Sequence, residues 1–152
     1  MKPLIVLLVS FFISLLILLI IHNRYEVAQS GSIAMSVMLA FTAIGHFIYP
    51  KGMTMMLPKI IPFKLQLIYA TGFFEILAAI SLLVMPYKIL TAWLLIFFFV
   101  LILPANIYAA NKHVDFEKVS FDGKGAAYLW FRIPLQVFFI LWIYFSAIVP
   151  LY

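Results

Sequence analysis

The chain has 152 residues, of which 67% are apolar or aromatic and only 10% are charged. Water-soluble domains are roughly half apolar and a quarter charged, and a fold of this length cannot hide so much apolar surface from water. The composition therefore excludes a soluble globular domain and predicts a single transmembrane domain over residues 1–152.

The charge and the residue types also exclude several kinds of function. The net charge is +5, but the basic residues are scattered between apolar runs and form no stripe of the kind that binds nucleic acid. There is no cysteine, so disulfides and thiolate metal sites are excluded. Because His22, His46 and His113 fall on different sides or at different depths, we expect neither a haem nor another metal site.

Five apolar runs follow one another along the chain. A helix rises 1.5 Å per residue, so a hydrocarbon core about 30 Å thick needs roughly 20 apolar residues. Transmembrane strands would show alternating polarity, which is missing here. The sequence predicts an all-α integral membrane helical bundle, with helices at residues 3–21, 32–49, 65–85, 89–110 and 126–149.

The first run and the connections have distinct characters. Residues 3–21 form a longer run than a signal-peptide core, and no small-x-small cleavage site follows, so we expect a retained helix. Residues 50–64 contain three prolines and should lie in the headgroup layer or fold back into the bundle. Residues 86–88 are expected to form a tight turn, and residues 111–125 a solvated loop.

Basic residues are divided unevenly between the two ends of the predicted bundle. Arg24 and Lys88 fall at one end, and seven lysines at the other. Because basic residues favour the cytoplasmic side, we predict a bacterial inner-membrane protein with a cytoplasmic N-terminus and an external C-terminus. The seven lysines are Lys2, Lys51, Lys59, Lys64, Lys112, Lys118 and Lys124.

Polar residues inside a membrane span are costly unless they are paired or face a cavity. Several interrupt the last four predicted helices, and their distance along each helix places them in the cytoplasmic half of the bundle. Three pairs four residues apart, Thr42–His46, Thr71–Glu75 and Arg132–Gln136, each share one helix face. The expected site residues are His46, Thr71, Glu75, Asn106, Arg132 and Gln136.

Two helix prolines accompany the amide side chains. Pro104 and Pro134 each stand two residues before Asn106 or Gln136. A proline inside a helix frees the carbonyl four residues earlier, which predicts unpaired acceptors near these amides. The cluster has two interpretations: a polar pocket for a small ligand, or a structural clamp between Glu75 and Arg132.

Several motifs share their order and spacing with a known family. GHFIYP at residues 45–50 precedes TGFFEILAAISLL at 71–83, LPANIYAA at 103–110 and RIPLQVFFILW at 132–142. Over residues 32–144 the chain resembles the DoxX-like family of small membrane proteins. The resemblance implies a four-helix core with an additional N-terminal helix, and the family motifs fall on His46, Glu75, Asn106, Arg132 and Gln136.

Three functions fit these observations. The first is binding of a small lipid-like or quinone-like molecule in the polar pocket. The second, suggested by relatives that act as receptor-assembly chaperones, is an accessory or chaperone subunit of a larger membrane complex. The third is a proton-coupled carrier or membrane redox enzyme that uses Glu75 and His46. We expect ligand binding rather than catalysis and assign no catalytic residue. The expected partners are the lipid bilayer, an amphipathic ligand such as a quinone, or a membrane protein. Nucleic acid is not an expected partner.

Overall fold

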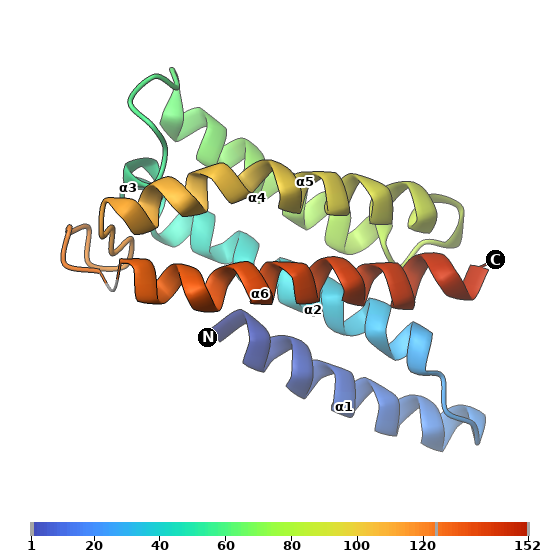
Figure 1. Cartoon of the computed structure of the whole chain (residues 1–152). Helices are drawn as coiled ribbons and strands as arrows, with labels where there is room; N and C mark the ends of the chain where they lie inside the picture. Colours follow the sequence, from blue (N-terminus) through green and yellow to red (C-terminus); the bar gives the residue numbers. More distant parts are fainter. Residues whose placement is uncertain (1, 124, 152) are drawn as a thin grey trace.

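The computed structural model describes residues 2–123 and 125–151 and shows a bundle of antiparallel helices (Figure 1). Five helical segments are long and apolar enough to cross a membrane, in agreement with the predicted all-α membrane bundle. Lys124, counted above among the basic residues, lies outside the described residues. The elements are α1 (Lys2–His22), α2 (Val27–Ile48), α3 (Pro50–Met55), α4 (Lys64–Ser81), α5 (Met85–Asn111), α6 (Ala126–Ile143), a π-helical segment (Tyr144–Ile148) and a 3₁₀ turn (Val149–Leu151).

One boundary each of α2, α4 and α5 differs from the prediction by four or more residues, and α4 ends at Ser81 rather than at residue 85. α2 begins at Val27 rather than at residue 32, so only residues 23–26 connect it to α1. The prediction of a tight turn at residues 86–88 is wrong, because these residues belong to the first turn of α5. The chain reverses instead at residues 82–84. Proline suits a first helical turn, where its missing N–H would have had no partner in the helix.

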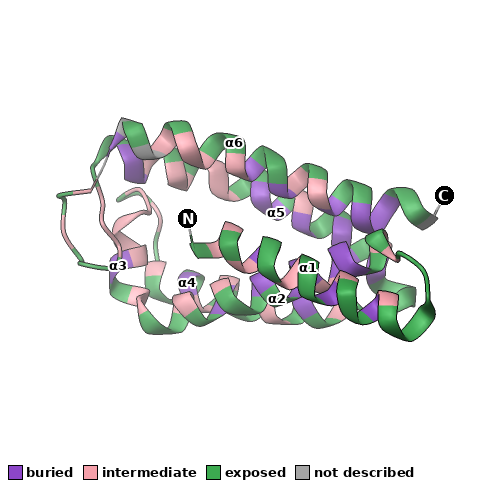
Figure 2. Cartoon of the chain, turned by 90° about the horizontal axis from the view of Figure 1, so that it is seen from below, coloured by how far each residue is buried: buried purple, intermediate pink, exposed green. Residues whose placement is uncertain are grey.

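The helices form two groups that meet mainly at one end of the bundle. α2 packs against α1 and α4, while α5 pairs with α6, and Figure 2 shows the two groups as separate layers. The π-helical segment Tyr144–Ile148 joins them, because it packs against both α2 and α5. The buried core therefore includes Leu39, Leu95 and Ile143. Between Leu129 and Leu135, by contrast, no residue of α6 is fully buried.

The opposite end of the bundle, which we call the loop end, is covered by α3 and residues 112–123. Gly52 of α3 lies so close to this loop that an added Cβ would stand 1.8 Å from the carbonyl oxygen of Phe116. Asp115 Oδ1 accepts hydrogen bonds from the backbone N–H groups of Glu117 and Lys118. Lys2, at the start of α1, forms an ion pair with Glu117 at 2.7 Å. The loop is thus held to α3 and α1, while most of its residues are exposed, in agreement with the predicted solvated loop.

Two residues of this loop, His113 and Val119, have a left-handed backbone conformation. Val119 has a φ of 54°, a left-handed conformation that costs an L-residue about 1–2 kcal/mol and is rare for β-branched side chains. Its side chain is exposed, so little packing would be lost on replacement. We expect Val119→Asn to stabilise the protein by about 1 kcal/mol, because asparagine tolerates this conformation. The measurement is the melting temperature in detergent, which should rise.

A matched control for this prediction is Phe121→Asn. Phe121 is also an exposed apolar residue of the same loop, and it is not among the residues with positive φ. This variant should melt close to wild type. Equal stabilisation by both variants would show that surface polarity, and not backbone strain, is the cause.

Candidate functional site

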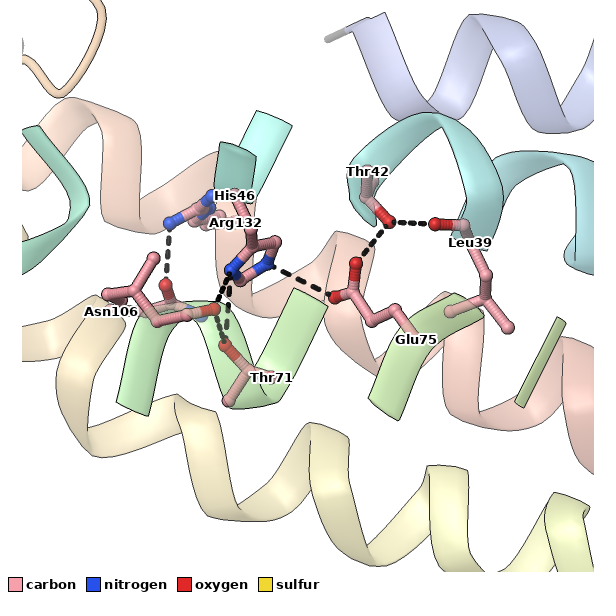
Figure 3. Close-up of polar contacts among 8 residues, drawn as sticks. Leu39, Thr42, His46, Thr71, Glu75, Asn106 and Arg132 are labelled. Carbon is pink, nitrogen blue, oxygen red and sulfur yellow. Dashed lines mark hydrogen bonds and ion pairs between the residues drawn. The ribbon is translucent and has the colours of Figure 1, made fainter. Parts of the chain in front are cut away.

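Two pairs of polar side chains, one helix turn apart, join α2 to α4 (Figure 3). Thr42 of α2 donates to Glu75 Oε2 of α4 at 2.9 Å. One turn away, Thr71 Oγ1 of α4 lies 3.1 Å from His46 Nδ1 of α2. This pairing follows from the sequence, because each helix carries its two polar residues four positions apart and the two helices run antiparallel.

The histidine and the carboxyl group also face each other directly. His46 Nε2 lies 3.5 Å from Glu75 Oε1, with 15% and 7% of the two side chains exposed. Gly72 makes this approach possible, since an added Cβ there would lie 2.8 Å from His46 Cβ. We call His46 and Glu75 the dyad. Glu75 lies near the middle of α4 and His46 in the last turn of α2, and a buried carboxyl group inside an apolar span is costly without a partner or a compensating proton.

A second polar set joins α5 to α6. An Arg132 N–H donates to Asn106 Oδ1 at 2.5 Å, and Asn106 Nδ2 donates to Gln136 Oε1 at 3.2 Å. Gln136 in turn donates through Nε2 to the backbone carbonyl of Phe99. We call Arg132, Asn106 and Gln136 the relay, because each side chain donates to the next. Arg132 and Asn106 are half-buried, whereas Gln136 is buried.

The two sets only partly match the predicted cluster. All six predicted site residues take part in polar contacts, and the structure orders them as the dyad with its threonines and the relay. The partners found for Glu75 are Thr42 and His46, and Arg132 donates to Asn106, so the structure does not show the proposed Glu75–Arg132 clamp. The reason is packing: α4 lies against α2, and α6 lies against α5.

Some participants were not among the expected site residues. The spacing placed Thr42 on one face with His46, but Thr42 was not predicted to belong to the site. The backbone acceptors at Leu39 and Ile68 carry no side-chain signal. The carbonyl that accepts from Gln136 belongs to Phe99, one residue before the Val100 carbonyl that Pro104 frees. Among the described residues, no three His, Asp or Glu side chains gather as metal ligands.

An open apolar groove of about 600 Å³ runs along α5 in the same half of the bundle. It is lined by Val100, Pro104, Ile107 and Tyr108 of α5 and by Pro58 of the loop after α3. Ligand pockets typically measure roughly 300–1,000 Å³ and are mostly apolar with a few polar groups. The lining residues of α5 stand before and after Asn106 along the helix, but no relay residue lines the groove.

Comparison with protein families places the chain. A family model described as a domain of unknown function, DUF8561, matches residues 35–147. The chain belongs to this family. Searches of curated proteins and of solved structures gave no match. The DUF8561 domain contains the dyad and the relay in full, whereas α1 lies before it.

Proposed function

We propose that this protein binds a small amphipathic molecule, quinone-like or lipid-like, whose polar head contacts the relay at Arg132 and Asn106. The supporting observation is a half-buried guanidinium inside an apolar span, held in place by Asn106 at 2.5 Å. Ionisable side chains within membrane spans are rare and often mark substrate or ion sites.

The chemistry of the two sets indicates what the head group should offer. Guanidinium, amide and hydroxyl groups supply N–H and O–H donors, and a guanidinium binds oxygen acceptors most strongly. The head should therefore carry carbonyl, carboxylate or phosphate oxygens. The apolar tail would lie along the groove of α5, which has the volume and lining expected of such a site.

The topology and the family resemblance are part of the same proposal. We propose a four-helix core of the DoxX-like type, made of α2, α4, α5 and α6, with α1 packed outside it against α2. We also propose that the loop end faces the cytoplasm of a bacterial inner membrane. Six of the lysines counted above lie at this end in the described residues, while Arg24 and Lys88 lie at the other.

Loss of the guanidinium should abolish ligand retention without unfolding the protein. We expect Arg132→Gln to lower retention of a bound quinone or lipid by about 10-fold or more, since hydrogen bonds to charged groups contribute about 1.5–3 kcal/mol. The measurement is native mass spectrometry of the full chain purified in nanodiscs made from its native membrane. A melting curve shows whether the variant remains folded.

The control is Arg24→Gln, which removes an exposed arginine at the opposite end of the bundle. This variant should retain as much ligand as wild type. The proposal fails if folded Arg132→Gln retains the wild-type amount, or if wild type carries no quinone or lipid beyond the bulk nanodisc lipids.

A further inference from the structure

The hydrogen-bond partners of His46 determine which of its nitrogens carries a proton. Nδ1 lies 3.1 Å from the backbone carbonyl of Ile68, and a carbonyl oxygen can only accept. The hydroxyl hydrogen of Thr71 is directed to the same carbonyl at 2.8 Å, which leaves a Thr71 lone pair facing Nδ1. Both contacts require Nδ1 to be the donor, so Nδ1 is protonated.

The other ring nitrogen then presents a difficulty. A neutral imidazole with a proton on Nδ1 has only a lone pair at Nε2, and Nε2 faces Glu75 Oε1 at 3.5 Å. If Glu75 were an ionised carboxylate, two electron-rich atoms would face each other in an apolar span. The contact becomes attractive only if a second proton lies on Nε2 or on the carboxyl group.

The contacts of Thr42 agree with this conclusion. Its hydroxyl has a single hydrogen, yet it lies within hydrogen-bond distance of both the Leu39 carbonyl, at 3.0 Å, and Glu75 Oε2, at 2.9 Å. Thr42 is the donor in both contacts, so Oε2 acts as an acceptor and the proton shared with His46 lies on the Oε1 side of the carboxyl group. A proton on Oε2 would instead leave the lone pairs of Nε2 and Oε1 facing each other.

We propose that His46 and Glu75 share one exchangeable proton and form a proton-binding site within the membrane span. The proton lies on Nε2, giving an imidazolium beside a carboxylate, or on Glu75, giving a neutral pair. Both forms have zero net charge. Without the shared proton the pair would carry a net charge of −1 where only 5% of Glu75 is exposed, which is a costly arrangement within a membrane span.

The charged groups on the surrounding helices do not replace this proton. α1 has no ionisable side chain between Lys2 and His22, and Lys88 of α5 lies at the opposite end of the bundle. Lys51 of α3 is exposed at the loop end. Arg132 of α6 donates to Asn106 in the relay. A ligand whose oxygen reached the dyad could accept a hydrogen bond from the shared proton, and this part of the inference rests on the proposed function.

Nuclear magnetic resonance of the full chain tests the proton directly. The ligand-free protein, with ¹⁵N-labelled histidine and ¹³C-labelled glutamate, would be placed in nanodiscs of phosphatidylethanolamine and phosphatidylglycerol. His22→Gln and His113→Gln assign the other two rings. At neutral pH we expect a protonated His46 Nδ1 together with either a protonated Nε2 or a protonated Glu75 carboxyl.

Two comparisons sharpen the result. In Glu75→Gln, which keeps a neutral hydrogen-bonding side chain, His46 should have a bare Nε2 at neutral pH. A bare Nε2 beside an ionised Glu75 in wild type at neutral pH would overturn the inference, and that measurement requires no variant to fold. Because no ligand is present, the outcome is independent of ligand retention by Arg132.

Discussion

Replacing Gly72 by alanine is expected to destabilise the protein by about 1–3 kcal/mol and to separate the dyad. The new Cβ would lie 2.8 Å from His46 Cβ and 3.2 Å from Phe47 Cε2. His46 Cβ is fixed to the backbone of α2, so the helices must move apart, and overpacking of this kind has costs in this range. The measurements are thermal melting in detergent and the His46 resonances, which should report a lost contact with Glu75.

Gly45→Ala is a closely matched control. Gly45 also lies in a transmembrane helix beside the site, but an added Cβ would meet only Met53 Cε at 3.5 Å, an ordinary contact with the flexible end of a side chain. Glycine is about 1 kcal/mol worse than alanine in a helix interior, so Gly45→Ala should be neutral or stabilising. If the two variants behaved alike, close helix approach at Gly72 would not be what positions His46.

Gly52→Ala is expected to release residues 112–123 from α3. The added Cβ would lie 1.8 Å from the Phe116 carbonyl oxygen and 2.6 Å from its carbonyl carbon. These are backbone atoms, so no side-chain rotation can relieve the contact, and the loop or the helix must shift. We expect the free energy of unfolding to fall by about 3 kcal/mol and proteolytic cleavage within the loop to become much faster. The cleavage is measured by mass spectrometry of the fragments.

Glu117→Ala separates this contact from the nearby ion pair. It removes the Lys2–Glu117 interaction, which is solvent-exposed and therefore contributes about 0–1 kcal/mol, while Gly52 keeps its contact with Phe116. Cleavage should then remain close to the wild-type rate. Rapid cleavage of Glu117→Ala with an unchanged Gly52→Ala would show that the ion pair holds the loop.

The residues of the candidate site could be predicted from the sequence, but their partners could not. The cost of polar side chains in lipid was enough to select His46, Glu75, Asn106, Arg132 and Gln136. Their partners were not predictable in the same way, because the charges suggested an interaction between Glu75 and Arg132. A carboxylate and a guanidinium on α4 and α6 pair only if those helices place them side by side, and helix packing is not encoded by charge.

Composition and the length of the apolar runs by themselves determined that this is a membrane bundle with five candidate spans, because an apolar span in lipid must satisfy its backbone hydrogen bonds internally and does so as a helix. Spacing within each helix also determined which polar residues share a face. Only the tertiary structure decided that α2 lies against α4 and α5 against α6. That choice depends on close contacts such as the one at Gly72, where the absence of a side chain lets two helices approach. It divides the polar residues into a proton-sharing dyad and a separate hydrogen-bond relay.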